Sequence, residues 1–134
     1  MSDTDFTRAA LVAAAWQARD GAICTYSKFA VGAALRDDAG RTWTGANVEN
    51  ASYTLGLCAE RVAIFHALTH GGRGFTEVVV VTDTAVPTSP CGACRQILWE
   101  FARGATVVMV ARGGVTKIAT VADLVPLPFD ESAL

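Results

Sequence analysis

Apolar residues recur at helical spacing in three segments of the chain, and this spacing predicts three helices. The first helix ends near Arg19, the second covers residues 58–70 and the third covers residues 91–103. Gly21 after the first segment and Gly71 after the second are typical of helix ends. The inner face of the third helix is expected to carry Ile97, Leu98 and Phe101.

Five shorter apolar segments predict strands at residues 29–36, 41–46, 75–82, 105–111 and 117–121. A turn-rich tetrapeptide joins the first two strands and suits an antiparallel hairpin at one edge of a sheet. The third strand contains an uninterrupted run of valines, which is typical of a central strand covered on both faces. Only five residues separate the last two strands, whereas a parallel crossover needs about a dozen or more, so these strands are expected to be antiparallel.

The order of these elements predicts a single α/β domain over residues 1–134 with a five-stranded mixed sheet. A helix, the central strand and a helix follow one another, so the second and third helices are expected to start at the same edge of the sheet. Cys58 and Cys91 lie at those two starts. The sequence therefore predicts that these distant cysteines meet.

Composition limits the partners that the protein can have. Charged residues make up 18% of the chain, below the roughly 25% typical of soluble domains, which favours a homo-oligomer. The net charge of −2 and the scattered Lys and Arg residues argue against a nucleic-acid partner. The acidic start at residues 1–5 is unlike a signal peptide, and the apolar run 9–16 is too short to span a bilayer. We therefore expect a cytoplasmic protein with no membrane partner and with reduced cysteines.

Three of the four cysteines belong to a split motif, Cys58-Ala59-Glu60 followed later by Pro90-Cys91-Gly92-Ala93-Cys94. The last two cysteines are three residues apart on one helical turn, and a helix N-terminus favours their thiolate form. Three thiolates fill three corners of a zinc tetrahedron and leave the fourth for water, as in catalytic sites. Zinc lowers the pKa of a bound water to near 7, and Glu60 is placed to carry its proton.

The cysteines also fit two other kinds of site. A redox dithiol would use the Cys-x-x-Cys pair but leaves Cys58 without a role. A structural zinc site would need a fourth protein ligand, for which the candidates are Cys24, His66 and His70. His66 lies eight residues past Cys58 on one helix, about 12 Å along its axis, and His70 lies one turn further, so neither reaches the same ion. Cys24 is interpreted as a plain semi-buried thiol, which leaves the fourth position to water.

Positive side chains follow both halves of the motif. Three thiolates give a zinc ion a formal charge of −1, and nearby hydrogen-bond donors would restore its Lewis acidity. Arg61 follows Glu60 and Arg95 follows Cys94, so both arginines are candidates for this role. The alternative for each arginine is solvation at the surface, and the alternative for Glu60 is to complement the helix dipole.

Four blocks in order resemble the small cytidine deaminase family that acts on free nucleosides. They are Tyr26-Ser27-x-Phe29-x-Val31-Gly32-Ala33-Ala34, Gly45-x-Asn47-Val48-Glu49-Asn50-Ala51-x-Tyr53, Cys58-Ala59-Glu60-Arg61 and Pro90-Cys91-Gly92-Ala93-Cys94-Arg95-Gln96. The resemblance implies a three-layer α/β/α cytidine-deaminase-like fold, one Zn²⁺ per chain and a homotetramer with shared active sites. It further implies hydrolysis of cytidine and 2'-deoxycytidine to uridine and 2'-deoxyuridine with release of ammonia, as in pyrimidine salvage.

The resemblance also implies roles for the residues of the split motif. The metal ligands would be Cys58, Cys91 and Cys94. Glu60 would carry the proton, and Arg61 would donate to the ligand thiolates.

Substrate contacts follow from the same resemblance. Asn47 and Glu49 would bind the ribose hydroxyls, in agreement with residues two apart in an extended segment that project the same way. Phe29 would stack near the base, with a core role as the alternative. Ala59 would offer backbone groups to the pyrimidine edge, and Ser89 would offer its carbonyl to the departing ammonia.

Two aromatic residues, Tyr53 and Phe129, would reach into a neighbouring subunit's site. One departure from the family pattern lies at Cys24-Thr25, where the family often has an aromatic residue and a proline.

Other functions compete with this interpretation. The nearest is a deaminase of a modified aminopyrimidine nucleoside such as blasticidin S. Editing of DNA or RNA fits less well, because those deaminases have a helix between the last two strands and this chain has room only for a turn. A non-catalytic, zinc-stabilised interaction module would give Glu60 no role and would need a fourth protein ligand, which is missing.

Overall fold

The computed structural model describes residues 3–134, with side chains from Thr7 onward, and contains one five-stranded sheet in the order β2-β1-β3-β4-β5. The strands are β1 (Val31–Arg36), β2 (Thr42–Ala46), β3 (Glu77–Thr82), β4 (Thr106–Val110) and β5 (Thr116–Thr120). The helices are α1 (Asp3–Arg19), α2 (Ala59–Thr69), α3 (Gly92–Phe101) and the short α4 (Val121–Leu124). Within this described part, no helix has the length and hydrophobicity needed to cross a membrane.

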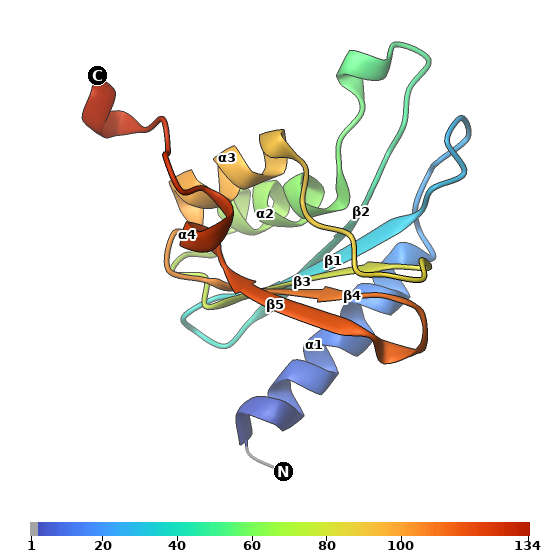
Figure 1. Cartoon of the computed structure of the whole chain (residues 1–134), viewed down its shortest axis with the longest axis horizontal. Coiled ribbons are helices and arrows are strands. Elements are labelled where there is room, and N and C mark those ends of the chain that lie inside the picture. The colour runs from blue at the N-terminus through green and yellow to red at the C-terminus, as the bar shows by residue number, and fades with distance from the viewer. Residues whose placement is uncertain (1–2) are drawn as a thin grey trace.

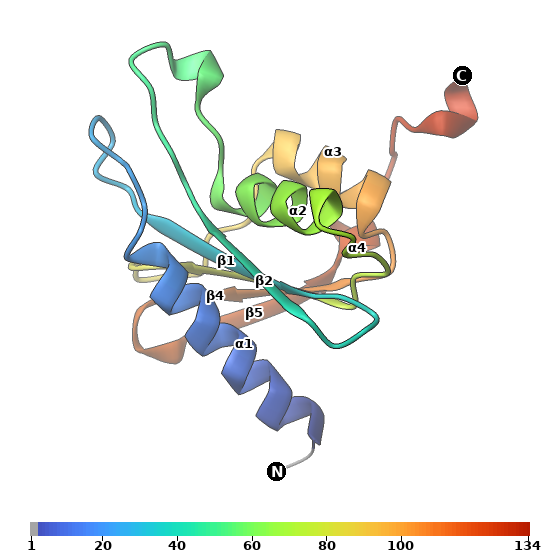
Figure 2. The ribbon, with the colours of Figure 1, turned by 180° about the vertical axis from the view of Figure 1, so that it is seen from behind.

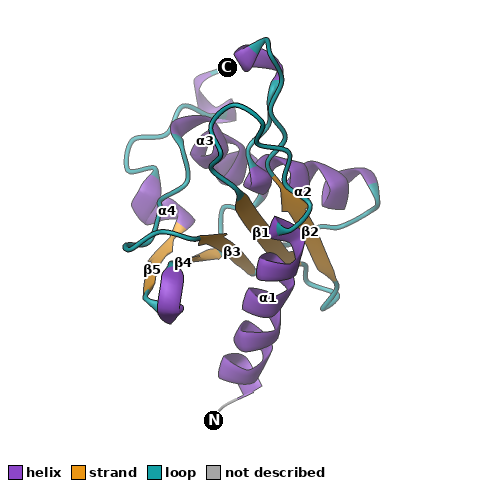
Figure 3. Cartoon of the chain, turned by 90° about the vertical axis from the view of Figure 1, so that its right-hand side faces the viewer, coloured by secondary structure: helices purple, strands orange, loops and turns teal. Residues whose placement is uncertain are grey.

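The sheet is the middle of three layers (Figures 1 and 2). Helix α1 covers one face, while α2 and α3 lie side by side on the other; Figure 3 shows the layers from the side. The valines of β3 alternate between two cores: Val78 and Val80 pack with α2 and α3, whereas Val79 and Val81 pack with α1. The expected central strand and three-layer α/β/α fold are confirmed.

Strand directions agree with the expected mixed sheet. Strand β1 pairs antiparallel with both β2 and β3, β3 pairs parallel with β4, and β4 pairs antiparallel with β5. The connection from β4 to β5 is tight because Gly113 and Gly114 adopt φ values of 74° and 84°, which only glycine adopts without strain.

Gly45 in β2 brings helix α2 close to the sheet. A Cβ atom at this position would lie 2.5 Å from the Ala63 amide nitrogen and 2.8 Å from the Ala59 carbonyl oxygen. Any larger residue would push the helix away from the sheet. The start of α2, where Cys58 and Glu60 lie, is therefore positioned by this close contact.

Two loops extend past the carboxyl end of β3, and they lie beside one another in Figures 1 and 2. They cover residues 20–30 and 47–58. A bridge from Val48 to Ile23 joins the two loops, and a bridge from Val48 to Leu57 lies within the second. The loops form a wall next to the start of α2.

The inner face of α3 differs from the expectation at one position. Phe101 is 43% exposed, whereas Cys94, Leu98 and Ala102 are buried. The buried residues are spaced four apart along the helix, and a row with this spacing does not include Phe101. The expected orientation of Phe101 was wrong.

Candidate active site and metal centre

The three candidate metal ligands come from two helix starts. Cys58 is the residue directly before α2, Cys91 is the residue directly before α3, and Cys94 lies in the first turn of α3. The Cys58 and Cys91 Sγ atoms are 3.6 Å apart, and all three Sγ atoms lie within 4.8 Å of one another. Thiolates bound at about 2.3 Å to one tetrahedral zinc ion would be about 3.8 Å apart, so the cluster fits this ion.

Cys58 and Cys94 shift each other's pKa in opposite directions. A hydrogen bond from Cys94, assisted by Arg61, lowers the pKa of Cys58 to about 5. The same bond to Cys58, together with burial, raises the pKa of Cys94 above its ordinary value. Cysteine binds metals as thiolate, so binding of a metal cation here would release protons from the cluster.

Arg61 lies against the thiol cluster from the first turn of α2. Its Nη2 atom donates to the Cys58 Sγ at 3.4 Å, and this contact raises the pKa of the guanidinium further. The Arg61 Nε atom is buried and has no hydrogen-bond partner among the described residues. The guanidinium therefore adds fixed positive charge beside a candidate ligand.

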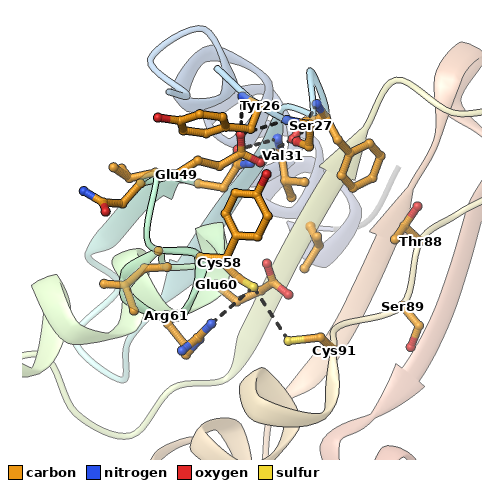
Figure 4. Close-up of a pocket in the computed structure, with 18 residues that line it drawn as sticks. Tyr26, Ser27, Val31, Glu49, Cys58, Glu60, Arg61, Thr88, Ser89 and Cys91 are labelled. Atoms are coloured by element: carbon orange, nitrogen blue, oxygen red, sulfur yellow. Dashed lines mark hydrogen bonds between the residues drawn. The ribbon is translucent and has the colours of Figure 1, made fainter. Parts of the chain in front are cut away.

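Glu60 is the second residue of α2 and is only 5% exposed. Burial raises the pKa of its carboxyl, and the charge on Cys58 adds to this effect. Its side chain lines a pocket together with Cys58 and Cys91 (Figure 4). A carboxyl that is buried and adjacent to the metal centre is suited to receive and return a proton.

The pocket has a volume of about 570 Å³. Its walls come from the two loops, the start of α2 and the segment before α3. The expected residues that line it are Phe29, Asn47, Glu49, Tyr53, Cys58, Glu60, Arg61, Ser89 and Cys91. A cavity of this size next to a metal centre can hold a small molecule.

Asn47 and Glu49 lie on the same wall and also hold it together. The Asn47 Oδ1 accepts from the Val31 amide and its Nδ2 donates to the Phe29 carbonyl, both at 2.8 Å. Glu49 Oε1 accepts from the Tyr26 and Ser27 amides at 3.0 Å each. The bonds from Ser27 come first in lowering the pKa of Glu49, which keeps it ionised. Because each carboxylate oxygen has two lone pairs, Glu49 keeps acceptor capacity for a further donor.

Two aromatic side chains that line the pocket are exposed to different degrees. Phe29 is 41% exposed and Tyr53 is 76% exposed. The Tyr53 ring meets the Tyr26 ring edge-on, with centroids 5.8 Å apart. Both aromatic side chains are therefore accessible to a flat ligand in the pocket.

Four expected site residues do not line the pocket of their own chain: the buried thiol Cys94, which belongs to the cluster behind it, and Ala59, Arg95 and Phe129. Ala59 is fully buried at the first position of α2, and Phe129 is 65% exposed on the C-terminal tail. Arg95 Nε donates to the Pro90 carbonyl and its Nη2 donates to the Ser89 Oγ, at 2.8 and 2.5 Å. Arg95 therefore holds the loop before α3. Its guanidinium donates to this loop and to the Leu124 carbonyl rather than to a thiol.

Three threonine hydroxyl groups next to the pocket are connected to one another, a feature that the sequence patterns did not predict. Thr82, buried at the end of β3, lies 2.7 Å from the Thr84 Oγ1 and 3.3 Å from the Thr88 Oγ1. Thr88 lines the pocket beside Ser89 (Figure 4). A threonine that ends a run of buried valines was the signal for a polar contact at the strand end.

Fold and site together define a class of protein. It is an α/β/α domain in which two adjacent helices present three thiols and a buried carboxyl at one sheet edge, beside a pocket for a small molecule. Known proteins with this combination are zinc-dependent deaminases of nucleobases.

Comparisons with known proteins agree with this class. A model of the cytidine and deoxycytidylate deaminase zinc-binding region matches residues 3–111. A cytidine deaminase of Sporosarcina psychrophila is 44% identical over 125 residues, covering 92% of this chain and 92% of that protein. A cytidine deaminase of Halalkalibacterium halodurans is 46% identical over 124 residues, covering 91% and 93%. The crystal structure of cytidine deaminase from Burkholderia pseudomallei matches with a TM-score of 0.86 and 42% identity over 96% of this chain and 100% of that chain.

The chain belongs to the cytidine and deoxycytidylate deaminase zinc-binding family. The family match and the three-thiol cluster identify zinc as its metal.

Proposed function

We propose that this chain, as one domain over residues 1–134, hydrolyses cytidine and 2'-deoxycytidine to uridine and 2'-deoxyuridine with release of ammonia. The observation that carries the proposal is the position of Glu60, which lies buried beside three converging thiols at the bottom of a pocket. Cytidine deaminases that cover most of this chain at 44–46% identity support it.

Three residues would hold one zinc ion: Cys58, Cys91 and Cys94. Zinc bound there would act as a Lewis acid that lowers the pKa of a water to near 7. Arg61 would offset part of the negative charge of the thiolates through its contact with Cys58. Arg95 would act on the centre only through the loop that carries Cys91.

Glu60 would move the protons of the reaction. Water adds at C4 of the pyrimidine and the bond from C4 to the amine breaks. Glu60 would take a proton from the water, deliver one to N3 and later protonate the leaving amine. The Ser89 carbonyl would accept a hydrogen bond from the ammonia as it departs.

The pocket walls would select a free nucleoside. Asn47 and the Glu49 carboxylate would bind the ribose hydroxyls, because an amide beside a carboxylate offers both a donor and acceptors. Phe29 would stack near the base, and the backbone of Ala59 would meet the pyrimidine edge.

A substrate panel tests this function. Zinc-loaded protein is followed by ultraviolet absorbance with cytidine, 2'-deoxycytidine, cytosine and blasticidin S, and zinc per chain is measured in the same sample. We expect turnover of the first two compounds and one zinc per chain. Inactivity on both nucleosides with turnover of blasticidin S would transfer the proposal to the modified nucleoside.

We further propose a homotetramer in the cytoplasm, where a reducing environment keeps the free thiols available to the metal. The C-terminal tail is evidence for an active site shared between subunits, because hydrogen bonds to α3 fix the position of the tail. Trp99 Nε1 donates to Asp130 at 2.9 Å, and Arg103 forms two bonds to Glu131 at 3.2 and 3.1 Å. Phe129 precedes these two bonded residues and is exposed, so a neighbouring subunit could contact its ring there.

Mixed tetramers test the sharing of Phe129. The variant F129A should lose activity several-fold, about the value of one aromatic contact. When F129A is refolded together with the inactive variant E60Q, the active sites of the F129A subunits would receive Phe129 from the E60Q subunits. Activity per F129A subunit should then rise. Unchanged activity in the mixture would contradict a shared site without affecting the proposed reaction.

A further inference from the structure

His66 and His70 form a pair at the end of α2 that is farthest from Cys58 and Glu60. His66 lies in the last turn of the helix, and His70 is the residue that ends it. Both side chains are exposed, and their ring centroids are 4.5 Å apart with the planes at 88°. The two histidines are too far along α2 to reach the thiol centre, but they are neighbours of each other.

Hydrogen bonding prepares His70 to act as a ligand. Its Nδ1 atom lies 2.8 Å from the His66 carbonyl oxygen and donates to it, which leaves the lone pair on Nε2. Histidine ligands in metal sites commonly donate their other ring N–H to a backbone carbonyl in this way, because the bond fixes the tautomer and the ring orientation. Among the side chains described from Thr7 onward, the ring nitrogens of His66 and the Nε2 of His70 have no hydrogen-bond partner.

The distance between the rings matches a known coordination geometry. Two imidazoles bound cis, at right angles, with metal–nitrogen bonds of about 2.0–2.1 Å have ring centroids about 4.5 Å apart. The same bonds at a tetrahedral angle would need about 5.2 Å. The observed 4.5 Å is compatible with cis coordination of one ion, such as Ni²⁺ or Cu²⁺, which take imidazole ligands at right angles.

Neighbouring residues limit the motion of the two imidazoles and determine the electrostatic environment of the pair. The Trp43 ring packs edge-on against His66 with centroids 5.4 Å apart, which limits rotation of the imidazole. The C-terminal end of a helix attracts cations. Two cationic side chains lie near this end of α2. Arg41 lies over Trp43 and is paired with Asp37 at 2.8 Å, and Arg73 donates to the Leu68 carbonyl.

We propose that His66 and His70 form a second metal site, which binds one Ni²⁺ or Cu²⁺ ion per chain with water in the remaining positions. The site is separate from the thiol centre and does not depend on the proposed deaminase reaction.

Nickel binding to the zinc-loaded protein tests the proposal. The protein is dialysed against increasing Ni²⁺, and nickel and zinc per chain are both measured. We expect one nickel per chain at saturation with the zinc retained. The variants H66A and H70A should each bind nickel about tenfold or more weakly, because the second imidazole of a pair binds intramolecularly. Uptake of nickel that is matched by loss of zinc would overturn the proposal.

A shuffled variant serves as the matched control. The double variant H70A/E100H keeps two histidines per chain but moves one to an exposed position on α3. It should bind nickel as weakly as H70A, and all of these variants should keep the zinc and the deaminase turnover of the parent. Parental nickel affinity in H66A, in H70A or in the shuffled variant would overturn the paired site.

Discussion

Cys58 and Cys91 occupy the same position relative to two different helices. Each is the residue directly before the first helical residue, each has extended backbone, and their Sγ atoms are 3.6 Å apart. Strand β3 follows α2 and precedes α3 in the chain, and it returns the chain to the sheet edge where α2 began. The metal centre is therefore set by the packing of whole elements, and loss of a ligand should affect metal binding more than folding of the sheet.

Replacement of Cys91 by serine should remove the zinc. A serine hydroxyl is a poor substitute for a thiolate ligand, and the remaining two thiols do not close the site. Metal analysis of purified C91S should find well below one zinc per chain, and turnover should be lost. The matched control is C24S, which changes a cysteine outside the thiol cluster and should keep its zinc. Stoichiometric zinc with activity in C91S would refute the ligand assignment.

Replacement of Glu60 should separate chemistry from metal binding. The variants E60A and E60Q should keep one zinc per chain but lose about 10²- to 10⁴-fold in kcat, the usual contribution of a general acid or base. The measurement is steady-state turnover of cytidine together with zinc content. Near-parental kcat in zinc-loaded E60Q would rule out Glu60 as the proton carrier.

Removal of the Thr82 hydroxyl should disturb the pocket wall. In T82V the Thr88 hydroxyl loses its partner, so kcat/KM for cytidine should fall about fivefold to tenfold, the value of one hydrogen bond of about 1 kcal/mol. The variant T82S keeps the hydroxyl and should recover kcat/KM even where its Tm is lower.

A double variant shows whether Thr82 acts through Thr88. If it does, T82V/T88V should have the same kcat/KM as T88V alone, since the pair shares one interaction. Fully additive losses would mean that Thr82 supports stability by another route.

Asp37 should contribute stability that disappears in acid. The buried carboxylate accepts hydrogen bonds from the Arg41 amide, the Arg41 Nε and the Trp43 Nε1 at 2.8–2.9 Å. Burial alone would raise the pKa of Asp37, but the bonds from Trp43 and Arg41 outweigh it and hold the pKa below its ordinary value. The stabilisation is therefore complete above the unfolded pKa of about 3.9 and is lost as the pH falls through the folded pKa.

The variant D37N should accordingly unfold at a lower temperature than the parent at pH 7. The difference in Tm should shrink as the pH falls below about 4, because the parent then loses the same charge. The neighbouring D38N serves as the control and should show a smaller change. A Tm difference for D37N that is constant with pH would contradict the role of the charge.

Much of the fold followed from local patterns. The uninterrupted valines of β3 required cover on both faces, and the short segment before β5 left no room for a crossover, so strand type and direction were predictable. The spacing of Cys58, Cys91 and Cys94 likewise predicted the metal, because the chemistry of three thiolates does not depend on the exact path of the chain between them.

Contacts between distant side chains were decided by the tertiary structure alone. The orientation of Phe101 depended on which row of α3 meets the sheet, and the contacts of Arg95 depended on where the loop before α3 passes. The partnership of Thr82 with Thr88 exists only because this loop turns back over the strand end. The sequence by itself determined which chemical groups the protein carries and in what elements. Packing decided which groups touch, because a contact needs a particular distance and angle that no local pattern encodes.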